Sequence, residues 1–141
     1  MQLLVLEKRK WAVVAITATR EDGPPACPVL DFLRDQQASD RASAKGFRAL
    51  FKRYADLGRE GLTQEQFHLA NQSEKIWEFI KGRIRIYCFE DGDVGMIVLT
   101  HGIHKQRQKT LAADVGRAAR ARALYLEHKK LGGLTIKETL S

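Results

Sequence analysis

Residues 76–100, IWEFIKGRIRIYCFEDGDVGMIVLT, decide the fold of this chain. The stretch contains three short runs of β-branched, aliphatic and aromatic residues, a composition typical of strands. These runs are 76–80, 84–89 and 96–100. Lys81-Gly82 can turn the first run into the second, and Asp91-Gly92 between hydrophobic runs is a strong hairpin signal. The stretch therefore predicts an antiparallel meander of three strands.

The residues before the meander predict a further strand and two helices. WAVVAIT at 11–17 has strand composition, and residues 1–6 extend this strand or pair with it. Pro28 suits the first position of a short helix. Between residues 40 and 57, large apolar residues recur at steps of three or four, and Gly58 follows where a helix cap is wanted. We expect these two helices to form a hairpin laid across the sheet.

The remaining segments complete an α+β pattern. Residues 59–74 are polar and predict a loop, whereas residues 114–131 predict a C-terminal helix. We therefore expect a small antiparallel sheet, mixed where the first strand joins it, with an N-terminal helical hairpin and a C-terminal helix. Residues 1–141 are expected to form a single domain, with a loosely attached tail after about residue 132.

The charge of the chain favours a polyanionic partner. Lys and Arg number 24 against 17 Asp and Glu, which gives a formal net charge of +7. Nucleic acid is the first expectation and an acidic protein the second, although a basic surface that is merely solvated has the same composition. Charge by itself leaves this choice open.

The cysteines and the hydropathy pattern favour the cytoplasm. Cys27 and Cys88 lie far apart and form no metal-binding or redox motif, so we expect small buried side chains in a reducing compartment. The apolar opening of the chain is too short for a signal peptide, and its basic cluster follows the apolar run. No apolar stretch approaches the ~20 residues that a membrane helix needs, so we expect no membrane partner.

Basic residues are concentrated on one face of the predicted meander. Arg83, Arg85 and Tyr87 alternate with Ile84 and Ile86, and a period of two places the first set on one face of a strand. The basic segment 104–109 follows the last strand. Converging cations on a sheet face can hold a phosphate. The alternative is that Arg83 and Arg85 are exposed residues that pair with Glu78, and that 104–109 is a solvated loop.

The segment from Lys75 to Thr110 resembles the core of the RelE superfamily, and is most similar to its phage-derived HigB-like branch. The similarity rests on Trp77-Glu78-Phe79, on Arg85 six residues before Asp91, and on the basic run from His101 to Thr110. The basic helix that ends near Lys130 is similar as well. The resemblance covers roughly the last 60 residues and is architectural before that.

The resemblance implies a ribosome-dependent mRNA endoribonuclease, the toxin of a type II toxin-antitoxin system. Its partners would be messenger RNA, the ribosome and a cognate antitoxin of the helix-turn-helix type. Such toxins need no metal and no other cofactor. The 2′-hydroxyl of the message attacks the adjacent phosphate and leaves a 2′,3′-cyclic phosphate.

The resemblance also implies roles for individual residues. Arg85 matches the strand arginine of the family, and we assign it to the charge on the phosphorane. Lys105, Lys109 and His104 are the candidates for proton transfer, and the sequence does not choose between them. We expect further contacts with the RNA from a second set of side chains, in which Tyr87 would stack on a base. This RNA-binding set is Arg83, Arg107, Tyr87 and Lys81.

Departures from the family pattern keep other functions open. The Lys81-Gly82 turn is shorter than the usual glycine-rich loop, and Phe79-Ile80 stands where a basic residue is frequent. One alternative is a gyrase poison of the ParE type, and another is a relative that only binds nucleic acid or antitoxin. His101 and His104 also form an H-x-x-H pattern. We predict no metal there, because residues three apart on a strand face opposite sides.

Overall fold

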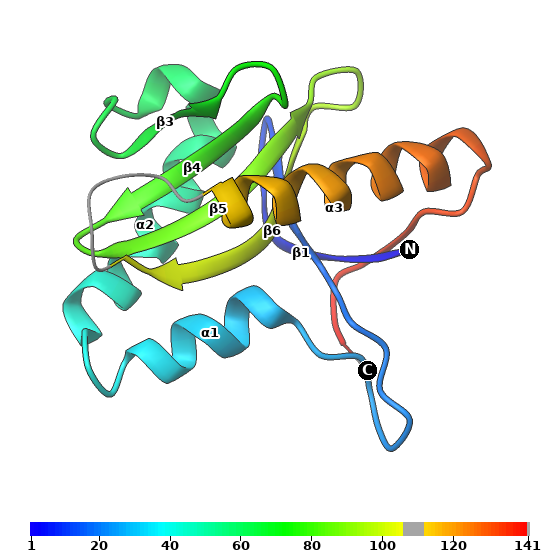
Figure 1. The fold of residues 1–141 in the computed structure, drawn as a ribbon, viewed down its shortest axis with the longest axis horizontal. Coiled ribbons are helices and arrows are strands. Elements are labelled where there is room, and N and C mark those ends of the chain that lie inside the picture. Colours follow the sequence, from blue (N-terminus) through cyan, green and yellow to red (C-terminus); the bar gives the residue numbers. More distant parts are fainter. Residues whose placement is uncertain (106–111, 141) are drawn as a thin grey trace.

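The computed structural model describes residues 1–105 and 112–140, and residues 106–111 and 141 lie outside this description. A mixed sheet runs through the molecule, with helices on both faces (Figure 1). The strands are β1 Gln2–Lys8, β2 Ala12–Ile16, β3 Phe67–Asn71, β4 Ile76–Lys81, β5 Ile84–Asp91, β6 Met96–His104 and β7 Thr135–Lys137. The helices are α1 Pro28–Gln36, α2 Arg41–Leu57, the short 3-10 helix η1 Gly58–Gly61 and α3 Ala112–Lys130. The strands lie side by side in the order β3-β4-β5-β6-β2-β1-β7.

The α+β class is as expected, but the prediction of a small sheet carrying an N-terminal helical hairpin is wrong. In the described residues the sheet has seven strands. Two of them were not predicted: β3, within the predicted loop 59–74, and β7, in the tail. Strand β1 pairs with β2, which is one of the two alternatives that the sequence left open for residues 1–6. The helices form no separate hairpin unit on a small sheet, because α1 packs mainly on β6 and α2 crosses β4, β1 and β2.

The predicted meander is confirmed, and it forms the centre of the polar face described below. Strands β4, β5 and β6 pair antiparallel, with turns at Lys81-Gly82 and at residues 91–96. The antiparallel pairing stops at β6, because its other neighbour, β2, pairs with it in parallel. The sheet is therefore mixed, and each strand of the meander presents alternate residues to the two helical layers.

One side of the sheet packs against α1 and α2 through aliphatic and aromatic side chains. Phe47 and Phe51 on the buried stripe of α2 meet Phe79 of β4, and the rings of Phe51 and Phe79 lie 5.2 Å apart, edge to face. Helix α2 ends at Leu57, and the capping residue Gly58 has a φ of 68°, in the left-handed region that favours glycine. Cys27 and Cys88 are buried free thiols, as predicted.

Helix α3 covers part of the other side of the sheet (Figure 1). Val115, Ala118 and Tyr125 form its buried face. At the far end of the helix, the Tyr125 hydroxyl and Lys129 Nζ donate hydrogen bonds of 2.7 and 2.8 Å to Asp91 Oδ2. Burial raises the pKa of Asp91, but these two donors outweigh it and lower the pKa below its ordinary value. This polar anchor ties α3 to the end of β5.

The tail that we expected to be loosely attached supplies the short strand β7, which pairs in parallel with β1 at the sheet edge. Its three residues are exposed, and the amino group of Met1 donates a 2.7 Å hydrogen bond to the carbonyl of Gly133 just before it. None of the helices in the described residues is long and apolar enough to cross a membrane.

Candidate functional site

Polar side chains form a row across four neighbouring strands on the side of the sheet that α3 covers. His68 of β3 lies opposite Glu78 of β4, Glu78 opposite Tyr87 of β5, and Tyr87 opposite His101 of β6. Directly opposed residues in an antiparallel pair share a face, so all four project to the same side. Asp114, in the first turn of α3, extends the row beyond His101, with 3.4 Å between its Oδ1 and His101 Nε2. We call these five residues the polar row.

A bulge in β6 brings His101 into this row. Tyr87 pairs with His101 and Cys88 pairs with Leu99, so Thr100 is an extra residue without a partner in β5. The Thr100 hydroxyl donates to the carbonyl oxygen of Tyr87 at 3.1 Å and fills the gap that the bulge opens. Without the bulge, Thr100 would lie opposite Tyr87 and His101 would face the other side.

Glu78 is the buried centre of the row, with 1% of its side chain exposed. His68 Nε2 lies 2.9 Å from Glu78 Oε1, and Arg85 Nε lies 3.8 Å from the same oxygen. A buried carboxylate requires such partners, because its charge has lost its hydration. One oxygen atom therefore holds an imidazole and a guanidinium close to each other.

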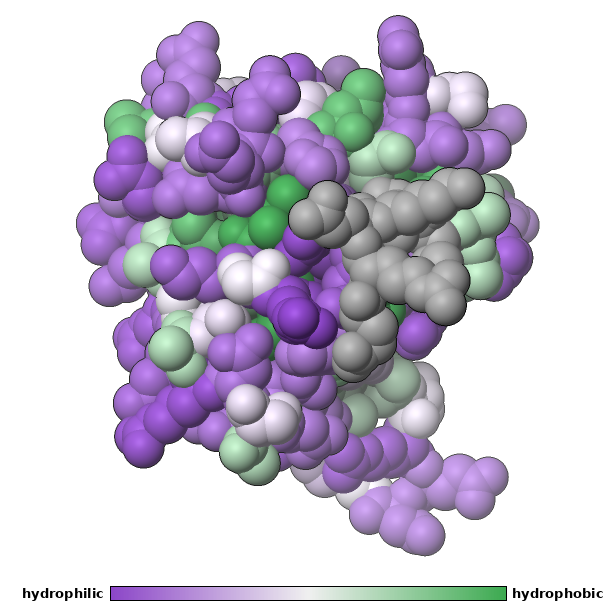
Figure 2. All heavy atoms as spheres, turned by 60° about the vertical axis from the view of Figure 1, so that its left-hand side comes forward, coloured by the Kyte–Doolittle hydropathy of each residue, from purple (hydrophilic) through white to green (hydrophobic). Residues whose placement is uncertain are grey.

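Arg85 lies on the same face, toward the Lys81-Gly82 end of the strands. Its side chain is 15% exposed, and its Nη1 donates to the carbonyl oxygens of Gly82 at 2.7 Å and Ile84 at 3.1 Å. The 3.8 Å approach of Arg85 Nε to Glu78 Oε1 supports the interpretation that Arg85 pairs with Glu78 across the strands. Hydrophilic side chains dominate the surface around this end of the sheet (Figure 2).

His101 is enclosed at the other end of the row. Its ring stacks on Tyr87 with 5.1 Å between centroids, and its Nδ1 lies 3.0 Å from Thr100 Oγ1. The hydroxyl and the ring nitrogen can each donate or accept, so this contact is a hydrogen bond in either tautomer of His101. Burial lowers the pKa of His101 and the charge of Arg117 adds to this, while Asp114 acts in the opposite direction.

Some buried polar atoms of the polar row and of the neighbouring Arg85 lack a hydrogen-bond partner. Among the described residues, four buried side-chain atoms make no hydrogen bond, and all of them lie on this side of the sheet. They are Glu78 Oε2, Arg85 Nε, Tyr87 Oη and His101 Nε2. Burial, the charges of Glu78 and Asp114 and a side-chain interaction with Glu78 raise the pKa of Tyr87, so its hydroxyl stays protonated and lies close to Glu78. Native cores contain few such atoms, and a cluster of them needs an explanation beyond packing.

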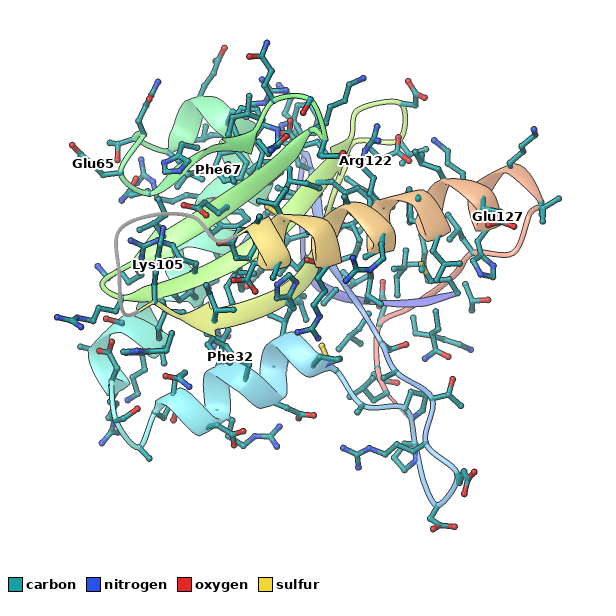
Figure 3. All side chains as sticks on the ribbon, viewed as in Figure 1. Phe32, Glu65, Phe67, Lys105, Arg122 and Glu127 are labelled. Carbon is teal, nitrogen blue, oxygen red and sulfur yellow. The ribbon has the colours of Figure 1, made fainter. Side chains whose placement is uncertain are left out.

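The structure brings two of the predicted catalytic residues to one face. Strand pairing sets Ile103 opposite Arg85, and alternation places Lys105 on the side of Ile103. The backbone N–H of Lys105 donates to the carbonyl of Arg83 at 2.6 Å, and its side chain is buried near that end of the sheet (Figure 3). Arg83 is exposed in the turn just before β5. The predicted catalytic Lys109 and the predicted RNA-binding Arg107 lie outside the described residues.

Three other predicted site residues are placed elsewhere or are enclosed. His104 lies opposite Ile84 on the face toward α2, with its Nε2 3.7 Å from Asp40 Oδ2. His101 and His104 therefore face opposite sides, as predicted. Lys81 runs along α2, where a Cβ on Gly46 would lie 2.7 Å from Lys81 Cε. The ring of Tyr87 has no exposed surface, so a base cannot stack on it in this arrangement.

Sequence reasoning missed His68, Glu78 and Asp114 as members of a site. His68 falls in a segment predicted as a loop, which left it without a cross-strand partner. The alternation of Phe67, His68 and Leu69 before the polar turn 72–75 was the signal that could have revealed β3. No local pattern marks Asp114, because its neighbour His101 comes from the sheet below the helix. The chain matches no protein-family model, and no curated protein matches it.

Proposed function

We propose that this chain is an endoribonuclease that acts without a metal on the α3-facing side of β4, β5 and β6. The observation that carries the proposal is the shared oxygen of Glu78, which holds His68 and Arg85 side by side. Lys105 lies on the same face and adds a second cation to this end of the sheet. A cation that binds a phosphate and an imidazole that moves a proton are the two requirements of RNA cleavage.

In the proposed reaction, the 2′-hydroxyl loses its proton to a base as its oxygen attacks the adjacent phosphorus. Arg85 leaves the carbonyls of the turn and stabilises the phosphorane with two parallel hydrogen bonds. The bond from phosphorus to the 5′-oxygen then breaks, and an acid protonates that oxygen. We assign one proton transfer to His68, whose Nε2 is held by Glu78 and whose Nδ1 would leave the carbonyl oxygen of Gln64, now 3.2 Å away, to reach the RNA. The other proton transfer we assign to Lys105. The products are a 2′,3′-cyclic phosphate and a 5′-hydroxyl.

The biological context of the proposal is a toxin that acts on messenger RNA at the ribosome. Its support is the resemblance of residues 75–110 to HigB-like toxins, together with the formal net charge of +7. Such a protein would work in the cytoplasm and would be restrained by a helix-turn-helix antitoxin. The charge suits the ribosome, since rRNA presents a dense field of phosphates.

Induction of the chain in bacteria, with mapping of the 5′ ends of translated messages, tests the proposal. We expect growth arrest and cleavage within reading frames. Arg85→Ala should lower cleavage by ~10²-fold or more, since it removes a charge aimed at the transition state. Arg48→Ala provides the matched control, because Arg48 is an exposed arginine of α2 on the other side of the sheet. Intact messages at good expression of the folded protein would contradict the proposal.

A second candidate is a protein of the same fold that binds RNA but does not cut it. The observation that favours it is the enclosure of Arg85, which contacts two carbonyls and Glu78 instead of pointing into solvent. This candidate predicts RNA binding that weakens steeply with salt, without any cyclic phosphate product. Replication arrest with intact messages would instead indicate a gyrase poison.

A further inference from the structure

A second site lies at the opposite end of the strands from the Lys81-Gly82 turn. Here a groove of about 940 Å³ opens between the C-terminal end of α2, the β3–β4 turn and the β5–β6 turn. Its volume is within the range of small-molecule sites. Trp11 and Trp77 both line it, and they are the 2 tryptophans of the chain. None of the residues assigned to RNA cleavage contributes to this groove.

Three flat groups are stacked at the wall of the groove. The rings of Phe67 and Trp77 lie 4.8 Å apart and only 6° from parallel, and Arg59 Cζ lies 4.5 Å from the centre of the Trp77 ring. Glu90 Oε1 fixes the guanidinium, at 2.7 Å from Nε and 2.6 Å from Nη2 of Arg59. The hydroxyl of Tyr54 holds Glu90 in turn through a 2.6 Å hydrogen bond to Oε2.

This network leaves a preorganised surface at the end of the stack. The side chain of Arg59 is 59% exposed although its inner face is covered by Trp77. Its charge is balanced by Glu90, so the remaining face is a flat, weakly hydrated plane. Such guanidinium planes are surfaces on which nucleobases stack.

Three further cations line the same groove as this plane, together with the carboxylate of Glu60. Lys10 and Lys75 line the groove from two turns, and Arg122 reaches it from α3 (Figure 3). Lys75 has a φ of 58° in the turn before β4, a conformation that is uncommon for residues other than glycine. The turn thus places a long basic side chain where glycine or asparagine would be the usual choice. Flexible ammonium groups beside a stacking plane suit a phosphate attached to a base.

We propose that this groove binds a nucleotide, with the base on Arg59 and the phosphate between Lys75, Lys10 and Arg122. The nucleotide is either free or one unit of a single-stranded RNA. Both sources present the same base and phosphate. The proposal does not depend on the cleavage reaction, because the two sites use different residues at opposite ends of β4 and β5.

Intrinsic fluorescence provides a direct test, since both tryptophans of the chain line the groove. The full chain is titrated with AMP, GMP, CMP and UMP, and separately with adenosine and with inorganic phosphate. We expect saturable changes with at least one mononucleotide, and at least ~10-fold weaker binding of adenosine and phosphate alone. Absence of saturation with all four mononucleotides overturns the proposal, even if the chain cleaves RNA.

Two variants separate stacking from charge. Arg59→Lys keeps a cation near Glu90 but removes the plane, so it should weaken binding by ~10-fold or more. Lys75→Ala should weaken binding of the nucleotide but leave the affinity for adenosine unchanged. Arg48→Ala is the control that leaves the groove intact. Circular dichroism verifies that each variant folds, and equal affinity of Arg59→Lys and the parent chain overturns the stacking geometry.

The source of the nucleotide follows from the same titration with a short oligoribonucleotide of the preferred base. Binding at least ~10-fold tighter than the mononucleotide indicates a unit of an RNA strand, because neighbouring phosphates add contacts. Equal or weaker binding indicates a free nucleotide. A nucleotide signal in a chain that cleaves no RNA would overturn the nuclease proposal alone.

Discussion

The two sides of the sheet differ in what they bury. The side toward α1 and α2 is filled with aliphatic and aromatic groups, among them Phe47, Phe51 and Phe79. The side toward α3 has a smaller apolar cluster around Val98 and Tyr125, and beside it the polar row. In the described part of the chain, the buried side-chain atoms without a hydrogen bond all lie on this second side.

This difference separates the residues that specify the fold from those that serve another purpose. Apolar packing stabilises a domain without needing directional partners, so the α1 and α2 side can be explained by burial alone. An unsatisfied buried polar atom costs free energy, and the four on this side have at best distant partners, such as Glu78 Oε1 at 3.8 Å from Arg85 Nε and Asp114 Oδ1 at 3.4 Å from His101 Nε2. The α3 side is therefore the place to look for function, and each side makes its own predictions.

The largest effect is expected on the apolar side, for Phe79→Ala. Phe79 is fully buried, and its ring packs against Phe51, Tyr54 and Phe67 at centroid distances of 5.2, 5.9 and 4.8 Å. Removing it leaves a cavity at the junction of α2 and the sheet, which should cost about 3–5 kcal/mol. Urea unfolding should show a lower midpoint with an unchanged slope. A loss below about 1 kcal/mol would mean that this side is not the dominant core.

The sequence was sufficient for the elements whose signals are local. The meander, the strand around Val14, helix α2 with its Gly58 end and the C-terminal helix all have clear periodicity or turn chemistry, and the structure contains them. The size of the sheet could not be read in this way. Strand β3 has polar flanks, and β7 is only three exposed residues whose pairing depends on β1 at the other end of the chain.

The site was predictable only where alternation along one strand decides the face. Alternation placed Arg85 and Tyr87 on the same side, and strand pairing confirms this. It did not reveal that Tyr87 lies under His101 and α3, because burial depends on a helix that arrives later in the chain. The role of His68 was hidden for the same reason, since its partner Glu78 becomes visible only once β3 and β4 are paired.

Asp91, which anchors α3, provides a test of a buried polar group that has hydrogen-bond partners. Asp91→Asn should cost about 1.5–3 kcal/mol, because it weakens the hydrogen bonds from Tyr125 and Lys129 at a buried position. Asp93→Asn is the matched control, since Asp93 is 91% exposed and 3.7 Å from the same lysine, and it should change stability by less than about 0.5 kcal/mol. Chemical unfolding of both variants at pH 7 measures these changes in stability. Equal effects would show that the anchor is only a surface ion pair.

Lowering the pH should destabilise the folded protein through His101, the buried histidine of the polar row. The pKa of His101 is lowered from 6.5 chiefly by burial, so the unfolded chain binds this proton more readily than the folded chain. Stability is therefore fully present above pH 6.5 and should decrease as the pH falls below it. Unfolding free energies between pH 7.5 and about 5.5 measure this slope. The slope should become shallower in His101→Gln and remain in His128→Gln, and an unchanged slope in His101→Gln would place the titrating group elsewhere.

The smallest effect, and the sharpest contrast between the two sides, is expected from two tyrosines that lose only a hydroxyl. Tyr54 belongs to the α2 side and donates a 2.6 Å hydrogen bond to Glu90, so Tyr54→Phe should cost about 1 kcal/mol. Tyr87 belongs to the α3 side, and its buried hydroxyl has no hydrogen-bond partner of good geometry in the described residues, although Glu78 lies close enough to raise its pKa. Tyr87→Phe should therefore change stability by less than about 0.5 kcal/mol, or increase it slightly, because no bond is lost and an unpaired polar atom is removed. Thermal and urea unfolding of both variants measure the two changes in stability. A cost at Tyr87 equal to that at Tyr54 would mean that its hydroxyl has a partner after all, and the polar row would then be a stabilising network and not a site held ready for a ligand.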